Sequence, residues 1–591
     1  MKTPSILKIF LIWRLKNIHS RPYLMFLSLL VGIGSGTFAV LLFNIVSFIQ
    51  RIIKVGLNKE HFNFLYLVYP VIGISLSVLF VKFILRKQLG HGVPGVLKAI
   101  STNQGLIKAH NMFSSVITSA LTVGFGGSVG LEGPSVSTGA AIASNIGGLF
   151  RLSFKHKVLL IGCGSAAAMA AIFKAPIAGI VFAFEVIMLD LTTSSIIPIL
   201  IASSSATITS YIFLGQDVIY PINLRSNFIL TDLPYYITLG IFTGLISVYF
   251  SRIYLFLGSL FEKVKSLFIR LIIGGSFLGF LILIFPSLYG DGYESVNHAL
   301  KGDFSYLFEN SFFYGYRDNI LVSIVLLIGI VLLKVFASSC TFGAGGIGGI
   351  FAPTLFIGAN SGLLFATLTK YFGFGVLSKS NFALVGMAGL LAGVMHAPLT
   401  GLFLIAEITG GYALFLPLMI TATIAYATVK YFDPNSVYTA QLAKNNELLT
   451  HHADKNALVM MKVDNLIETN FKTVDKDANL GDLVKVIAES TRNIFPVVDE
   501  NNYFIGVVNL DDIRNVIFQH ELYDKLTVNE LMTVPSTHVT PDDSMEEVAK
   551  KIQQTGRFNI VVLKDGKYLG FVSRANVFLN YRKILKNISA E

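Results

Sequence analysis

The chain has 591 residues, of which 53% are hydrophobic and only 14% are Asp, Glu, Lys or Arg. This composition excludes a disordered chain and argues against an ordinary soluble enzyme, since average proteins carry about 25% charged residues. Residues 1–450 hold 29 basic and 15 acidic residues, whereas residues 451–591 hold 17 basic and 20 acidic residues. We therefore expect a basic membrane body followed by a soluble tail. We attribute the positive charge to cytoplasmic loops and not to nucleic-acid binding.

The N-terminus shows no cleavable signal peptide, because the first long apolar run starts near Pro22 and exceeds signal length. Basic residues precede this run: Lys2, Lys8, Arg14, Lys16 and Arg21. The positive-inside rule therefore places residues 1–21 in the cytoplasm. Two cysteines, Cys163 and Cys340, are too few for a zinc site or a disulfide framework, and we expect both to be small packing residues.

The membrane body contains many uncharged runs close to the roughly 20 residues that a spanning helix needs. In chain order these runs are 22–50, 111–131, 192–215, 233–251, 271–290, 335–369, 380–406 and 408–429. Shorter apolar runs lie between them, and many segments are rich in glycine and interrupted by proline. Discontinuous helices of this kind are expected where a channel or transporter holds its ion near the membrane midplane.

The membrane body also repeats itself. At an offset of 219 residues, Gly130, Pro134, Gly139 and Ala140 match Gly349, Pro353, Gly358 and Ala359. At an offset of 222 residues, Ala175, Pro176, Gly179 and Glu185 match Ala397, Pro398, Gly401 and Glu407. Two collinear matches predict two structural halves, roughly 22–215 and 233–432. The repeat itself leaves open whether the halves are parallel or inverted.

Three glycine- and proline-containing segments are the candidates for the chemistry, at 90–94, 130–134 and 349–353. Each ends in a proline and precedes an apolar run that can form a helix, which predicts a helix N-terminus. Helix N-termini present free N–H groups and a partial positive charge, so three that converge would bind an anion weakly enough for conduction. The alternative is that these glycines and prolines only serve packing and kinks.

Glu132 interrupts the otherwise uncharged stretch 111–150. A carboxylate within a membrane is a functional hypothesis by default. At a helix N-terminus its ionised form is stabilised by the same dipoles that attract an anion. We therefore expect Glu132 to imitate the anion, to be displaced by it, or to be protonated and move away. The alternative is a helix-capping acid at an interface.

In order, the segments G-H-G-V-P, G-L-E-G-P and G-I-F-A-P resemble signatures of the CLC family of chloride channels and proton/chloride exchangers, and the resemblance covers nearly the whole chain. It implies an all-α polytopic membrane protein with two inverted repeats of tilted and broken helices. It also implies a homodimer with a separate anion path in each subunit. By this resemblance Glu132 is the gating glutamate. The implied anion-binding residues are His91, Gly92, Gly349, Ile350, Phe351 and Tyr438.

Tyr438 matches the family pattern, whereas His91 departs from it. Tyr438, in Asn435-Ser436-Val437-Tyr438, resembles the family tyrosine that closes the inner side of the central site, although alone it would be interpreted as an interfacial anchor. His91 replaces the central serine of chloride-preferring members, which leaves open a preference for chloride or nitrate. Its imidazole can donate to an anion and charge near neutral pH. Alternatively the ring points away, and a neighbouring glycine amide faces the path.

A further departure from the family concerns proton coupling. Proton-exchanging members carry Glu-Glu where this chain has Glu185-Val186, and valine cannot carry a proton. Family channels also read Glu-Val there, so the sequence favours passive conduction and marks Val186 as a lost position of the proton pathway. Glu185 and Glu407 occupy matching repeat positions, which favours a structural role for both. Leu131 replaces the usual Arg or Lys and would weaken the positive potential of the outer vestibule.

The soluble tail, residues 451–591, contains a second repeat at about 455–520 and 526–585, each copy a helix, a strand, a turn, a strand and a helix. This looks like an α/β pair of CBS domains. Such pairs often bind ATP, ADP or AMP through a Ser/Thr and an Asp three residues apart. The corresponding positions here are Asn509 with Asp512, and Ser573 with Asn576, so neither copy has the full pair. The alternative is a dimerising regulatory scaffold.

Together these features predict a homodimeric, multi-pass protein of the cell membrane with both termini in the cytoplasm. It would conduct chloride or a similar small anion passively through a voltage-gated, glutamate-gated channel. A coupled proton/chloride antiporter is the alternative, and a membrane-anchored nucleotide sensor is more remote. We predict no enzyme activity, because the sequence shows no nucleophile–base pair, metal-ligand cluster or phosphate loop. We predict no required cofactor and no metal.

Overall fold

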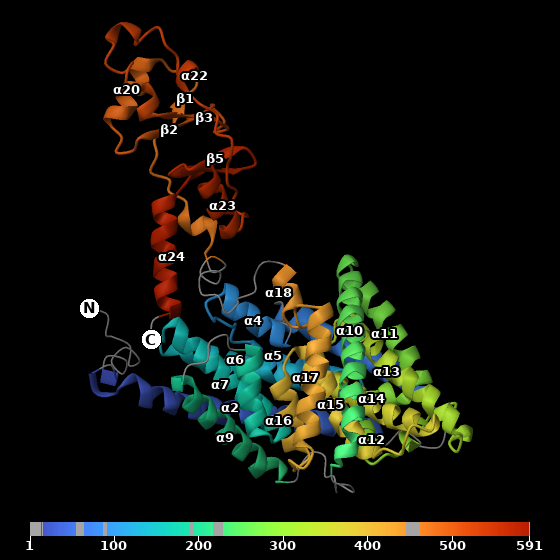
Figure 1. Cartoon of the computed structure of the whole chain (residues 1–591). Coiled ribbons are helices and arrows are strands. Elements are labelled where there is room, and N and C mark those ends of the chain that lie inside the picture. The colour runs from blue at the N-terminus through green and yellow to red at the C-terminus, as the bar shows by residue number, and fades with distance from the viewer. Residues whose placement is uncertain are drawn as a thin grey trace. The chain divides into compact units, whose positions relative to one another are not determined.

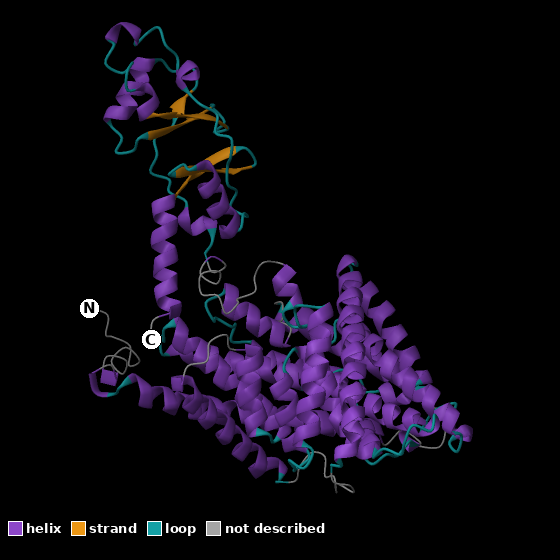
Figure 2. Ribbon diagram, in the orientation of Figure 1, coloured by secondary structure: helices purple, strands orange, loops and turns teal. Residues whose placement is uncertain are grey.

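The computed structural model describes residues 13–14, 16–54, 64–86, 92–187, 193–216, 228–444, 458 and 461–589. The predicted site residue His91 and most of the predicted N-terminal segment lie outside this set. The chain divides into two compact units, Met1–Asn445 and Asn446–Glu591. The first unit is helical (Figure 1), and the strands of the described residues all belong to the second unit (Figure 2).

The helices of the first unit form two series. The first series is α2 (Ser20–Lys54), α3 (Leu65–Leu79), α4 (Gly92–Thr102), α5 (Asn111–Gly124), α6 (Glu132–Leu149), α7 (Phe154–Phe173), α8 (Pro176–Phe182) and α9 (Thr193–Leu214). The second is α10 (Leu233–Lys263), α11 (Leu267–Ile284), α12 (Tyr293–Leu300), α13 (Ile320–Gly343), α14 (Phe351–Tyr371), α15 (Lys379–Met395), α16 (Pro398–Ile408) and α17 (Phe415–Phe432), followed by α18 (Ala440–Lys444). Two π-helical turns, η1 (Phe80–Leu85) and η2 (Ala183–Ile187), extend α3 and α8.

Nine helices among the described residues are long and apolar enough to cross a bilayer. They differ in burial: 89% of the apolar window of α14 is buried inside the protein, against 22% for the helix at Leu65–Leu85. α14 therefore lies in the interior of the unit, whereas α3 presents most of its surface outward. A helix apolar all round, such as α14, is expected in the core of a large membrane protein.

Two of the predicted apolar runs are each broken into two elements. Run 335–369 contains the end of α13 and nearly all of α14, separated by a turn in which Gly345 has a φ of 101°. Run 380–406 contains α15 and α16, separated at His396, which has a φ of 56°. Counting charges does not detect these breaks, because they are made by left-handed backbone and by a proline at the start of the next helix.

The two series pack in the same way, as expected for two structural halves. α6 packs on α7, α7 on α9 and α2 on α9, just as α14 packs on α15, α15 on α17 and α10 on α17. The contacts are made by matching glycines, because a Cβ on Gly139 or Gly164 would collide with the other residue's backbone, as would a Cβ on Gly386 with Gly358. Small residues let membrane helices approach closely and pack tightly.

The halves meet at an antiparallel bridge between equivalent residues. The N–H of Gly130 donates to the carbonyl of Gly349, and the N–H of Gly349 donates to the carbonyl of Gly130, both at 2.8 Å. When equivalent residues contact each other reciprocally, a local two-fold axis relates the two halves. The bridge is thus the arrangement expected for inverted repeats of the CLC type.

The second unit contains two small sheets. The first sheet is formed by β1 (Val474–Asp475), β2 (Ile494–Val498) and β3 (Phe504–Asn509), with β1 parallel to β2 and β2 antiparallel to β3. The second is the antiparallel pair β4 (Asn559–Lys564) and β5 (Lys567–Ser573). The helices are α20 (Leu480–Ala488), α21 (Leu510–Ile513), α22 (Val528–Leu531), α23 (Met545–Thr555) and α24 (Arg574–Ser589). This order confirms the predicted α/β pair and adds β1.

The two copies of the tail exchange segments. Val463 and Leu466, at the start of the first copy, belong to the hydrophobic core of the second copy. Val528 of α22 belongs in turn to the core of the first copy. The linear boundaries 455–520 and 526–585 do not describe this packing. Because each core contains residues from both copies, the two copies fold as one unit.

Asp543 provides a test of the stability of the tail. Its carboxylate accepts hydrogen bonds from Lys551 Nζ at 2.5 Å and from Thr540 Oγ1 at 2.6 Å. Burial alone would raise the pKa of Asp543, but these hydrogen bonds outweigh burial and hold the pKa below its usual range. A lowered pKa stabilises the folded state above about pH 4, and this stabilisation is lost as the pH falls below that value.

We expect Asp543→Asn to destabilise the tail at pH 7 by about 1 kcal/mol. The matched control is Asp542→Asn, since Asp542 is an exposed neighbour of equal charge. Hydrogen exchange of the α23 amides in the full-length protein measures the difference. Equal protection in Asp543→Asn and the parent protein would show that the Lys551 contact contributes nothing.

Candidate functional site

Glu132 begins helix α6 and is buried, with 1% of its surface exposed. The preceding residues of the segment form the bridge of Gly130 to Gly349, so the start of α6 lies beside the start of α14. A buried carboxylate needs hydrogen-bond donors or a positive potential, and the N-terminus of a helix supplies both. The acid is therefore held at the meeting point of the two halves.

The two carboxylate oxygens of Glu132 have different surroundings. Oε1 accepts a hydrogen bond from the hydroxyl of Tyr293, the first residue of α12. Oε2 is buried and has no hydrogen-bond partner within the described part of the chain. A Cβ built on Gly349 would lie 3.3 Å from Oε2, and one built on Gly130 would collide with it. Oε2 is thus directed at the bridge between the halves.

The three predicted helix N-termini converge. Gly92, at the start of α4, has a φ of 50°, and a Cβ added to it would lie 3.5 Å from the Cα of Gly133. A Cβ added to Gly133, in the first turn of α6, would lie 3.0 Å from the Cα of Gly349. A side chain at Gly133 would therefore require the start of α14 to shift. At Gly92 the space suffices for a Cβ, and glycine is favoured there by the left-handed φ.

Three of the predicted anion-binding residues, Gly349, Ile350 and Phe351, lie at the start of α14. Ile350 and Phe351 are buried. The N–H of Gly349 already donates to the carbonyl of Gly130, so this N–H is not available to an anion, in contrast to the predicted anion contact. Gly349 contributes only the space left by its missing side chain. Phe351 packs against the rings of Phe173 and Phe182, at centroid distances of 5.5 and 6.2 Å. These ring contacts fix the first turn of α14.

Tyr438 follows α17 in a short turn before α18 and is also buried, with 5% of its surface exposed. It interacts electrostatically with Glu132. Gly92, Phe351, Tyr438 and Glu132 thus come from four separate segments of the first unit. The predicted partner His91 precedes Gly92 directly but lies outside the described residues.

Glu185 and Glu407 cap helices of the opposite half. Glu185 accepts hydrogen bonds from the N–H groups of Leu399 and Thr400 in α16, at 3.0 and 2.7 Å. Glu407 accepts hydrogen bonds from the N–H groups at positions 177 and 178 of α8, at 3.1 and 2.8 Å. This reciprocity supports the structural role predicted for both acids. Val186, the next residue in η2, is half-buried.

Two residues near the site, Tyr293 and Lys334, were not predicted from the sequence. A signal for Tyr293 was available, because Gly290-Asp291-Gly292 before it resembles Gly90-His91-Gly92 before Val93, at an offset of 200 residues. Lys334 is the single charge within α13, which marks it as a functional or structural exception in a membrane helix. It is fully buried, and its ammonium donates to backbone carbonyls.

In the tail, the four predicted nucleotide-binding residues are engaged in local hydrogen bonds. Asn509 donates to Asp512 at 2.8 Å. Ser573 donates to Glu468 and accepts from the N–H of Asn576 at 3.1 Å. An open cavity of about 470 Å³ adjoins the second pair. Its lining residues are Glu468, Arg492, Phe558, Asn559, Ser573, Ala575, Asn576 and Leu579. This volume falls in the range of small-molecule sites.

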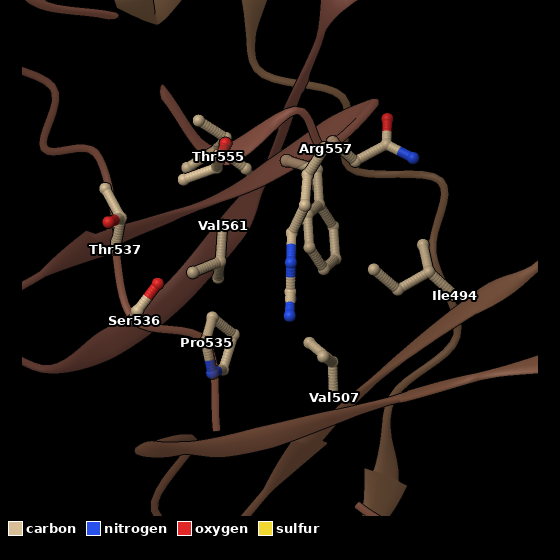
Figure 3. Close-up of a pocket in the computed structure, with 11 residues that line it drawn as sticks. Ile494, Val507, Pro535, Ser536, Thr537, Thr555, Arg557 and Val561 are labelled. Carbon is tan, nitrogen blue, oxygen red and sulfur yellow. The ribbon is translucent and has the colours of Figure 1, made fainter. Parts of the chain in front are cut away.

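A second, narrow pocket lies between the two copies of the tail. Ile494 and Val507 of the first copy and Pro535 of the second line it, and the side chain of Arg557 points into it (Figure 3). Its free space is about 10 Å³. Since that is about the room for a single water molecule, a nucleotide does not fit there without rearrangement.

The model of the family described as voltage gated chloride channel matches residues 72–430, and the CBS domain model matches residues 463–519 and 528–582. The chain belongs to the CLC family. It is a multi-pass membrane protein for CLC-type anion transport, and it carries two CBS domains.

Individual relatives are consistent with this membership. A ClcB-like protein of Ralstonia nicotianae is 31% identical over 64% of this chain and 86% of its own length. The H(+)/Cl(-) exchange transporter ClcA of Vibrio cholerae is 29% identical over 72% of this chain and 90% of its own length. The solved structure of a slow cyanobacterial Cl-/H+ antiporter superposes with a TM-score of 0.60 at 23% identity, covering 72% of this chain and 98% of that chain. This likeness supports the CLC fold.

The reciprocal caps of the CLC unit lead to a stability prediction. We expect Glu185→Ala and Glu407→Ala each to lower the thermal unfolding midpoint in detergent by about 2–4 °C, because each leaves two first-turn amides without an acceptor. Glu262→Ala is the control, since this acid is exposed on α10. Midpoints equal to that of the parent for both cap variants would contradict the capping role.

Proposed function

We propose that this protein exchanges chloride for protons across the cell membrane, working as a homodimer with one anion path in each subunit and both termini in the cytoplasm. The observation that carries the proposal is the buried carboxylate of Glu132 where the starts of α4, α6 and α14 meet. The partial positive charges of helix starts attract a carboxylate and a chloride ion alike. One position can therefore be occupied by either.

Glu132 links the anion to the proton by simple competition. While ionised, its carboxylate occupies the outer end of the path, and Oε2 faces the bridge with no hydrogen-bond partner within the described residues. Chloride competes for the same potential and displaces it. Protonation removes the negative charge, so the neutral side chain loses its attraction to the helix starts and leaves. A group that alternates between these states carries a proton in one direction while anions move in the other.

We further propose that chloride is bound by the backbone amides of Ile350 and Phe351, by the start of α4 at Gly92 and by the hydroxyl of Tyr438. No Lys or Arg is assigned to this site, which agrees with the weak binding that transport requires. His91 is assigned to the same path on the basis of its place beside Gly92. Its imidazole would set the preference between chloride and other small anions.

The sequence favoured a passive channel because of Val186, and the comparisons do not support that preference. A proton/chloride exchanger matches 72% of the chain, and the superposed solved structure is that of an antiporter. Glu185 is occupied as a helix cap, so we propose that the proton reaches Glu132 by a hydrated route past Val186. Passive conduction is the second candidate, and the apolar side chain of Val186 is the observation that favours it.

Flux through purified protein in liposomes tests the proposal, with chloride efflux and proton movement recorded together. We expect an imposed chloride gradient to drive protons uphill in the parent protein. Glu132→Gln should abolish proton movement while chloride still flows, because the amide neither ionises nor carries a proton. Val186→Glu should strengthen coupling by placing a carboxyl on the inner side of the route.

Chloride efflux without any uphill proton movement in the parent protein would instead identify a passive channel. In that case Val186→Glu becomes informative: a gain of coupling would show that this valine interrupts the proton route. No change in either flux on Glu132→Gln would remove Glu132 from the mechanism altogether.

For the tail we propose adenine-nucleotide binding at the second copy, supported by the cavity beside Ser573 and Asn576 and by Arg492 at its edge. Arg492 pairs with Glu468 at 2.8 Å and also donates to Asn470 at 2.7 Å, and a phosphate oxygen could replace the carboxylate as its partner. We expect millimolar ATP to protect the amides around 573–576 from hydrogen exchange in the full-length protein. No protection by ATP, ADP or AMP would favour the scaffold function.

A further inference from the structure

Glu132 is held by a hydroxyl from the opposite structural half. Tyr293, the first residue of α12, donates a hydrogen bond from its phenol oxygen to Glu132 Oε1. Oε2 is directed at the bridge of Gly130 and Gly349. One carboxylate oxygen is therefore fixed by a side chain, while the other faces the potential of the helix starts.

The position of Tyr293 depends on a buried lysine. Lys334 of α13 is fully buried, and its ammonium donates to the carbonyl of Leu288 at 3.2 Å and to the carbonyl of Gly290 at 3.1 Å. The same ammonium lies 4.8 Å from the ring centre of Phe356 in α14. A buried ammonium with two carbonyl acceptors is costly to release in a low-dielectric interior. Lys334 therefore fixes the segment that leads into α12.

The first half of the unit holds the same segment. The hydroxyl of Ser128 donates to the carbonyl of Leu288 at 2.7 Å, and the N–H of Gly290 donates to the carbonyl of Gly126 at 3.0 Å. Gly292 then turns the chain into α12 with a left-handed φ of 84°. The backbone before Tyr293 is thus bonded to both halves, so its hydroxyl reaches Glu132 from a rigid support.

We propose that Tyr293 is a positioning residue that holds the ionised carboxylate of Glu132 in the closed position and thereby sets how readily chloride and protons release it. The proposal rests on the gating role proposed above for Glu132. A hydrogen bond from a phenol to a carboxylate is charge-assisted and favours the ionised, bound form. This bond must break whenever an anion takes the place of the carboxylate, so the Tyr293 hydroxyl opposes chloride binding and opening alike.

Other ionisable groups act on this pair from the elements packed around it. Asp291, directly before α12, repels the charge of Glu132 and is attracted by Lys334 of α13. Tyr438, after α17, interacts with Glu132 electrostatically. All three groups are retained when only the hydroxyl of Tyr293 is removed. Tyr293→Phe therefore isolates the contribution of the one hydrogen bond.

The experiment measures chloride binding by calorimetry in detergent and chloride flux against pH in liposomes, both with the full-length protein. For Tyr293→Phe we expect chloride binding about tenfold tighter and the pH of half-maximal flux higher by about one unit, the effect of losing one charge-assisted hydrogen bond. Tyr306→Phe is the matched control, because this buried hydroxyl donates to Asn360 of α14 instead. It should change neither quantity.

Glu132→Gln separates this inference from the proposed function. If Glu132→Gln alters flux and its pH response but Tyr293→Phe leaves chloride affinity and the pH midpoint at parent values, the role of Tyr293 is overturned while the gate stands. A shift caused by Tyr293→Phe that persists in the Glu132→Gln background also overturns it, since the hydroxyl then acts elsewhere. If Glu132→Gln changes neither chloride flux nor its pH response, both the gating role of Glu132 and the positioning role of Tyr293 are contradicted.

Discussion

The free backbone N–H groups at the starts of α4, α6 and α14 are the constraint on which the rest of this protein depends. In a bilayer interior, backbone donors without partners are costly, so a negative group must lie where the three helices converge. Glycines at Gly92, Gly133 and Gly349 permit that convergence. The buried carboxyl group of Glu132 lies at this place. The buried amino group of Lys334 donates to backbone carbonyls instead and is not part of the proposed anion site.

Because the halves are related by a two-fold axis, the first-turn N–H groups of α8 and α16 are capped by equivalent acids. Glu185, just after α8, caps α16, and Glu407, near the end of α16, caps α8. The symmetry ends at the site itself, where the position equivalent to Glu132 is Phe351, packed among aromatic rings. One half thus contributes the titratable group and the other an apolar, rigid helix start. The proposed anion path accordingly has a single carboxyl group where the two helix starts meet.

The tail follows a different principle, because its two copies cannot be separated without opening both cores. The start of the first copy, at Val463 and Leu466, completes the second core, and α22 completes the first. The N–H of Phe571 in β5 donates to the carbonyl of Glu468 at 3.0 Å, which joins the same two regions through the backbone. A ligand bound beside Glu468 would therefore contact segments from both ends of the tail.

Much of this protein could be predicted from the sequence alone. The apolar runs, the repeat, the three glycine–proline segments, the acid at Glu132 and the tail pair are local patterns, and local patterns record where helices start and which face is apolar. The break within run 380–406, the engagement of the Gly349 amide and the reciprocal caps required the tertiary structure. So did Tyr293 and Lys334. Tyr293 and Glu132 are 161 positions apart, and a hydrogen bond over that separation depends on how packed helices meet, which neither composition nor spacing encodes.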